Sequence, residues 1–111
     1  MGRLFLGIDV GTSSTKALLV REDGATVALA SSSYPLLTPH EDWVEQRPAD
    51  WWDALVAAVR KATADVDKGE IAAIGLSTQG NTVLLADEAG TPLRDAITWL
   101  DRRARLERDE L

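Results

Sequence analysis

The sequence contains no cysteine and a single histidine, His40, among its 111 residues. Disulfide bonds, thiolate metal sites and a cysteine nucleophile are therefore excluded, and one histidine cannot build a zinc site alone. No apolar run approaches the roughly 18 residues of a membrane span. The first residues are interrupted too soon, by Arg3 and Gly7, to form a signal peptide. We therefore expect a cytoplasmic protein.

Basic residues are also scarce, since 12 Lys and Arg stand against 18 Asp and Glu, a formal net charge of −6. Nucleic acids and anionic membranes bind basic surfaces, so we expect neither as the main partner. A small anionic ligand is compatible with this charge, because it responds to local dipoles. Apolar residues make up 45% of the chain, enough for the core of one small domain.

The order of apolar segments predicts an α/β domain with a mixed sheet. Three strands are expected in an antiparallel meander, with Gly24 in the second turn at a position that favours positive φ. Pro48 suits the first position of a helix whose apolar residues share one face. The strand after that helix should lie parallel to the first strand. The expected strands are 4–10, 15–21, 26–33 and 71–77, the helix runs from 48 to about 65, and its face comprises Trp52, Leu55, Val56, Val59 and Ala62.

The remaining segments carry weaker patterns. Residues 34–47 predict an ordered connection with His40 at the surface, and Trp51 and Trp52 predict packing in a core or interface. Residues 82–86 and 97–99 predict short strands separated by a turn at 87–90. A helix is expected from Arg102, where Asp101 could be the N-cap. Its solvated face would carry the alternating charges of Arg102, Arg103, Arg105, Arg108, Glu107, Asp109 and Glu110.

Residues 7–16 are the most informative segment, because a polar turn lies between two apolar strands. We expect Gly11 to adopt positive φ and to let a ligand approach closely. Successive backbone N–H groups and the hydroxyls of residues 12–14 can converge on phosphate oxygens. Asp9 could hold a hydrated Mg²⁺ that bridges to those phosphates, and Lys16 could supply a compensating charge. The alternative is an ordinary hairpin with a polar loop, in which Lys16 is a solvated strand residue.

Four segments in this order resemble the start of the FGGY family of carbohydrate kinases, which includes xylulokinases, gluconokinases and glycerol kinases. They are residues 7–16, 43–46 leading into 48–52, 74–77 with Gln79, and 96–103. The resemblance covers essentially the whole chain. It implies a ribonuclease-H-like (actin-like ATPase) fold, incomplete here, and phosphorylation of a sugar or polyol by MgATP in a cleft between two such domains.

The resemblance also implies roles for single residues. Asp9, Gly11, Thr12, Ser13, Ser14 and Lys16 would bind the cofactor, with Asp9 organising Mg²⁺. Gln79, Gly80, Asn81, Trp99 and Asp101 would bind the sugar. These residue types suit a polyol, because amides and carboxylates bind hydroxyls while an aromatic face covers C–H groups. Asp101 could equally be only a cap.

Two departures limit what the resemblance implies. None of the acidic residues here matches the family's general-base Asp, which is expected beyond Leu111 together with the second phosphate loop and the adenine region. Gly80 and Asn81 replace the Met-His of xylulokinases and the Arg-Glu of glycerol kinases, so the sugar stays open. Residues 1–111 are thus interpreted as the N-terminal part of the first kinase domain, without the second domain and inactive alone.

Two alternatives accompany this interpretation. One is a non-catalytic nucleotide- or sugar-binding module that forms a homo-oligomer or self-associates through apolar strands whose covering segments are absent. The other is a different actin-like ATPase, such as a hydantoinase-type subunit, against which residues 43–46 and 97–103 argue.

Overall fold

The computed structural model describes residues 2–111, which form two compact units. The first, here called the sheet unit, comprises the chain up to Tyr34 and Trp51–Gln79. The second, here called the polar unit, comprises Pro35–Asp50 and Gly80–Leu111. The buried residues of the sheet unit are mainly apolar, and those of the polar unit are mainly polar.

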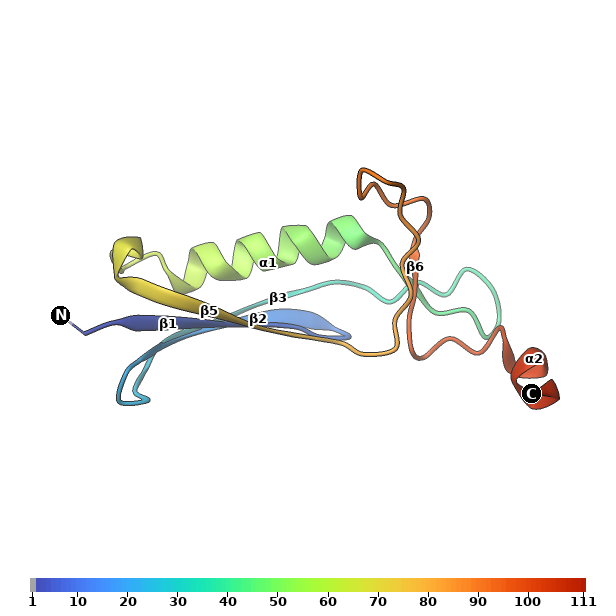
Figure 1. Ribbon diagram of the computed structural model, residues 1–111, viewed down its shortest axis with the longest axis horizontal. Coiled ribbons are helices and arrows are strands. Elements are labelled where there is room, and N and C mark those ends of the chain that lie inside the picture. The colour runs from blue at the N-terminus through green and yellow to red at the C-terminus, as the bar shows by residue number, and fades with distance from the viewer. Residues whose placement is uncertain (1) are drawn as a thin grey trace. The chain divides into compact units, whose positions relative to one another are not determined.

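The sheet unit is built on a four-stranded sheet in the order β3-β2-β1-β5 (Figure 1). The strand β1 (Leu4–Val10) pairs antiparallel with β2 (Ser14–Arg21) and parallel with β5 (Ile71–Thr78), while β3 (Thr26–Ser33) pairs antiparallel with β2. The predicted meander, the parallel fourth strand and the central place of the first strand are therefore confirmed. Gly24 has a φ of 87°, as its turn predicted.

The helix α1 (Pro48–Ala62) covers one face of the sheet (Figure 1). Its buried residues are the alanines Ala54, Ala58 and Ala62, with Leu55 and Val59 partly buried beside them. The buried face of α1 differs from the predicted one, which included Trp52, since Trp52 is 66% exposed. Small side chains let the helix lie close to the leucines and isoleucine of β1, whereas an indole there would hold it away.

The end of α1 also differs from the expected Asp65. The helix stops at Ala62, where the hydroxyl of Thr63 donates to the carbonyl oxygen of Val59 at 2.9 Å. Such back-bonding competes with helix continuation. A short 3₁₀ helix, η1 (Lys68–Glu70), follows and is capped by the carboxylate of Asp67, which accepts from the N–H of Gly69.

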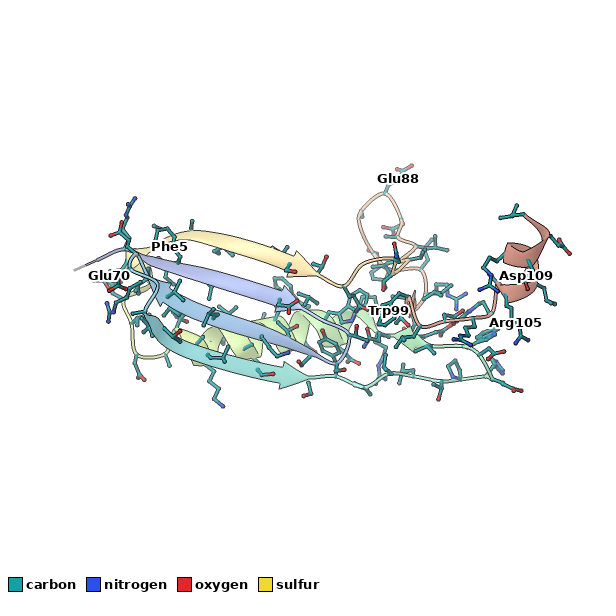
Figure 2. The ribbon with its side chains drawn as sticks, turned by 90° about the horizontal axis from the view of Figure 1, so that it is seen from below. Phe5, Glu70, Glu88, Trp99, Arg105 and Asp109 are labelled. Carbon is teal, nitrogen blue, oxygen red and sulfur yellow. The ribbon has the colours of Figure 1, made fainter. Side chains whose placement is uncertain are left out.

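The other face of the sheet carries no helix within the described residues (Figure 2). Leu18 and Leu29 lie 37% and 64% exposed on it. The edge strand β5 leaves Ile74 and Leu76 64% and 66% exposed. The sheet unit thus buries one side well and leaves apolar surface on the other side and at its edge.

The polar unit contains two short strands, β4 (Glu45–Gln46) and β6 (Ala96–Ile97), which pair antiparallel. The strand expected at 82–86 was wrong, because only isolated bridges form there, from Val83 to Ile97 and from Ala86 to Pro92. The short strand predicted at 97–99 is displaced to Ala96–Ile97.

The last helix, α2 (Arg105–Glu110), begins three residues later than predicted, and its N-cap is Ala104. Asp101 is therefore not its cap. The carboxylate of Asp101 accepts instead from the backbone N–H groups of Val44 and Arg103, at 2.7 and 2.9 Å. No helix within residues 2–111 has the length and apolar character needed to cross a bilayer.

Candidate functional site

A tight turn joins β1 to β2 at the predicted phosphate segment. The backbone N–H of Gly11 donates to the carbonyl oxygen of Ser14 at 3.0 Å. A Cβ atom on Gly11 would lie 3.1 Å from that same oxygen, so a larger residue would require that carbonyl to shift by a few tenths of an ångström. The expected positive φ at Gly11 was wrong, since the two glycines with positive φ in the described chain are Gly24 and Gly90. Glycine at position 11 suits the close approach within the turn.

The turn is held from both neighbouring strands. Tyr34, directly after β3, donates its backbone N–H to the carbonyl of Ser13 at 3.1 Å and its hydroxyl to the carbonyl of Gly11. Gln79, directly after β5, donates its backbone N–H to Val10 at 2.8 Å and its amide nitrogen to Gly11 at 3.3 Å. The structure therefore brings Gln79, predicted for the sugar pocket, against the predicted phosphate turn.

Tyr34 was missed by sequence reasoning, because a single aromatic residue after three serines carries no periodic signal. Its side chain is 7% exposed. Burial raises the pKa of Tyr34, the nearby Thr15 hydroxyl opposes that rise, and the charge of Asp9 adds to it. The Thr15 hydroxyl is itself buried without a hydrogen-bond partner in the described structure, so it lies near Tyr34 but outside bonding geometry. The phenol thus stays protonated and can donate at neutral pH.

A row of polar residues crosses the sheet beside the turn. Asp9 lies opposite Lys16 in the β1–β2 register and opposite Ser77 in the β1–β5 register, and Lys16 lies opposite Ser31. Asp9 and Lys16 are both exposed, and the Lys16 ammonium donates to the Ser14 hydroxyl at 3.3 Å. The row therefore places one carboxylate and one ammonium next to the turn on the open face of the sheet.

A shallow depression of about 520 Å³ lies over this part of the open face. Asp9 and Lys16 line its polar end, and Leu18 and Leu29 line its apolar part. Its floor includes Gly7 and Gly75, which are paired in the β1–β5 register. The missing side chains at these two positions make the depression.

The remaining predicted sugar residues lie in the polar unit. Gly80 has open space where a Cβ would lie, Asn81 has a left-handed φ of 54°, and Trp99 is 52% exposed. The antiparallel bridge between Val83 and Ile97 sets the segment that carries Asn81 beside the segment that carries Trp99.

Asp101 lies in an ion network that sequence reasoning did not foresee. Its carboxylate pairs with the Arg103 guanidinium at 2.6 Å, and that guanidinium also pairs with Glu45 at 2.6 Å. Hydrogen bonds from the Arg103 side chain, and then from the backbone of Arg103 and Val44, lower the pKa of Asp101 to about 2, against the effect of burial. The hydrogen bond to Asp101 raises the pKa of Arg103.

The predicted solvated face for Arg103 was wrong. Its side chain is 17% exposed, lies outside α2 and stacks over the ring of Trp43 at 3.9 Å. Arg94 adds a second, more exposed pair with Glu45 at 2.6 Å. The sequence signal for this network was Glu45, an acid that directly follows Trp43 and Val44. Apolar periodicity alone does not explain an acid at that position.

Magnesium can be tested against the residues at the turn. No group of three or more His, Asp or Glu side chains suited to a metal occurs within residues 2–111. Among the residues that line the depression, Asp9 is the carboxylate. One carboxylate fits Mg²⁺, which keeps several waters and shares phosphate oxygens, and it does not fit an all-protein metal cage.

The chain is similar to known proteins of one family. The profile of the FGGY family of carbohydrate kinases, N-terminal domain, matches residues 4–111. A glycerol kinase of Methylobacterium nodulans is 42% identical over 106 residues, 93% of this chain and 21% of that protein.

Two solved structures superpose on nearly the whole chain. A xyloylose kinase from Brucella ovis has a TM-score of 0.92 at 37% identity, over 97% of this chain and 23% of its own. A gluconate kinase from Lactobacillus acidophilus has a TM-score of 0.92 at 31% identity, over 99% and 22%. These matches confirm the ribonuclease-H-like (actin-like ATPase) fold as a partial domain, and the chain spans about a fifth of the length of the curated relatives it matches.

Proposed function

Because the chain belongs to the FGGY family of carbohydrate kinases, we propose that it forms the N-terminal part of the first actin-like domain of an ATP-dependent kinase. The reaction is transfer of the γ-phosphate to a hydroxyl of a sugar or polyol. The observation that carries this proposal is the turn at Gly11, held from two strands beside an exposed Asp9 and Lys16. We place the activity in the cytoplasm, where ATP is available.

The residues of the turn divide the work of binding phosphate. Backbone N–H groups of residues 12–14, with the hydroxyls of Thr12, Ser13 and Ser14, bind phosphate oxygens, while Gly11 closes the turn through its N–H to Ser14. Lys16 neutralises part of their charge. Asp9 would hold Mg²⁺, which when bound neutralises charge on the phosphates. Since phosphoryl transfer depends on positioning and charge neutralisation, a rigid turn serves it directly.

The sugar is proposed to bind at Gln79, Gly80, Asn81, Trp99 and Asp101. Relatives named for glycerol, gluconate and a pentulose support a polyol or sugar without choosing among them. Direct contact between Asp101 and the sugar stays a prediction. Its side chain is 4% exposed and already binds Arg103 and Val44, which favours a role in holding the loop of Trp99.

The general base, the adenine-binding region and the second domain are proposed to follow Leu111 in a longer polypeptide. This segment alone is therefore expected to be inactive. A coupled assay of ADP release against a panel of sugars and polyols tests this on the segment and on the longer polypeptide. We expect no ADP release from the segment and turnover with one or a few substrates from the longer polypeptide. A longer polypeptide that binds nucleotide but never releases ADP would contradict the proposal.

A second candidate is a module that binds or self-associates without catalysis. The exposed Ile74 and Leu76 on the edge strand β5 favour it, because an unpaired apolar edge is a template for a second copy. Self-association and the kinase role are compatible in one polypeptide.

A further inference from the structure

The carbonyl oxygen of Gly11 is a junction between three strands of the sheet unit. It accepts the hydroxyl of Tyr34 from the end of β3 and the amide nitrogen of Gln79 from the end of β5. A carbonyl oxygen has two lone pairs, so these two donors satisfy it completely. Neither donor is a backbone group, and each can be removed without breaking a sheet hydrogen bond.

The orientation of this carbonyl fixes a neighbouring donor. The peptide plane that contains the Gly11 carbonyl also contains the N–H of Thr12, and in a trans peptide the two groups point in opposite directions. The described chain has no cis peptide bond. While Tyr34 and Gln79 hold the carbonyl, the Thr12 N–H is therefore directed away from them.

We propose that Tyr34 and Gln79 are positioning residues, which aim the Thr12 N–H for phosphate by holding the Gly11 carbonyl from two strands. The inference rests on the proposed function of the turn. It also gives Gln79 a second task, because the residue that opens the proposed sugar segment touches the phosphate turn through its side chain.

The surroundings of Tyr34 support a fixed hydroxyl. Tyr34 is nearly buried. Its backbone N–H is bonded to the carbonyl of Ser13 and its hydroxyl to the carbonyl of Gly11, so the residue is fixed at both ends. Thr15 beneath it is fully buried, and its hydroxyl has no partner in the described structure. The Tyr34 hydroxyl therefore has one bonded acceptor there, the Gly11 carbonyl.

Hydrogen exchange of the segment without ligand tests the inference. The variants are Tyr34→Phe, which removes only the hydroxyl, and Gln79→Leu, with the exposed neighbours Ser33→Ala and Thr78→Ala as controls. We expect exchange at Gly11, whose N–H is bonded to the carbonyl of Ser14 across the turn, to accelerate about fivefold in each of the first two, as for loss of one neutral hydrogen bond, and to stay unchanged in the controls. The carbonyl carbon resonance of Gly11 should move in the same two variants.

Two results would overturn the inference. One is unchanged exchange and an unmoved Gly11 resonance in Tyr34→Phe and Gln79→Leu. The other is equal acceleration at Leu6 and Ile8 of β1, which would make the hydroxyl and amide general supports of the fold. Titration with MgADP separates the proposed function: if the wild-type segment and the longer polypeptide both fail to bind it, that function falls, while the exchange result still decides the inference.

Discussion

Different interactions stabilise the interiors of the two units of this chain. In the sheet unit, eight apolar residues from β1, β2, β3 and α1 form one buried cluster. In the polar unit, Glu45, Gln46 and Thr98 are buried, and Ala96 is the buried apolar residue in its described part. Apolar burial is non-directional and shared among many contacts, whereas an ion network depends on each partner. Loss of a buried apolar side chain should therefore weaken the whole sheet unit, whereas loss of one charged partner should act locally in the polar unit.

The largest effect is expected from a cavity in the sheet unit. Leu19 is fully buried, so Leu19→Ala should lower the free energy of unfolding by about 3 to 5 kcal/mol. Urea denaturation followed by circular dichroism measures it. Leu29→Ala on the same sheet, where the side chain is 64% exposed, should cost less than about 0.5 kcal/mol. Equal losses in both variants would mean that burial does not distinguish the two faces.

A smaller but more local effect is expected from Arg103→Ala. It leaves the carboxylates of Glu45 and Asp101 buried without their shared partner and should destabilise the polar unit by about 2 to 3 kcal/mol. Amide exchange at Val44 and Thr98 should rise while exchange at Leu6 and Leu19 holds. Arg94→Ala is the control, because that side chain is 41% exposed and its loss should cost below about 1 kcal/mol. A uniform rise across both units would remove the contrast between them.

Low pH should weaken the polar unit through protonation of Asp101. The pKa of Asp101 falls from 3.8 to about 2 on folding, so its contribution is complete above pH 4 and disappears as pH falls towards 2. The polar unit should lose about 1 to 2 kcal/mol across that range, allowing for solvent near the network. Asp101→Asn should flatten this part of the pH profile, read from the amide resonance of Val44, whose N–H is bonded to Asp101. An unchanged profile in that variant would place the acid-sensitive group elsewhere.

The smallest effect on folding is expected at the edge of the sheet. Ile74→Lys alters a side chain that is 64% exposed and should change stability by less than about 0.5 kcal/mol. It should nevertheless weaken self-association, because a lysine on an edge strand opposes pairing with a second copy. Sedimentation at rising concentration measures this. A wild-type segment that stays monomeric at high concentration would end the self-association proposal.

The pattern of apolar residues predicted the sheet unit because burial of those residues forms its core. The four strands and their pairing could be predicted, since almost continuous apolar runs such as residues 4–10 belong in a sheet centre. The face of α1 could not, because alanines are too weakly apolar to outweigh Trp52 in a sequence pattern. A polar turn between the first two strands was predicted. The side chains that donate to it, those of Tyr34 and Gln79, were not.

The polar unit escaped prediction because charged residues read as solvent-exposed by default. Arg103 and Asp101 are held by partners more than 50 residues away along the chain, Val44 and Glu45. No local pattern encodes such pairing. Residues 82–86 have the composition of a strand but find only single bridging partners, so they stay irregular. The residues proposed to bind the sugar came from the resemblance to a family, and periodicity did not indicate them.

Titration of the isotopically labelled segment with MgADP tests most directly whether the turn after β1 binds nucleotide phosphate. The amide resonances of Gly11, Thr12, Ser13 and Ser14 should shift together, and Asp9→Asn should weaken that response while Asp53→Asn, an exposed change on α1, leaves it intact. Shifts that avoid these four amides, or that persist unchanged in Asp9→Asn, would contradict the assignment of this turn as a phosphate site.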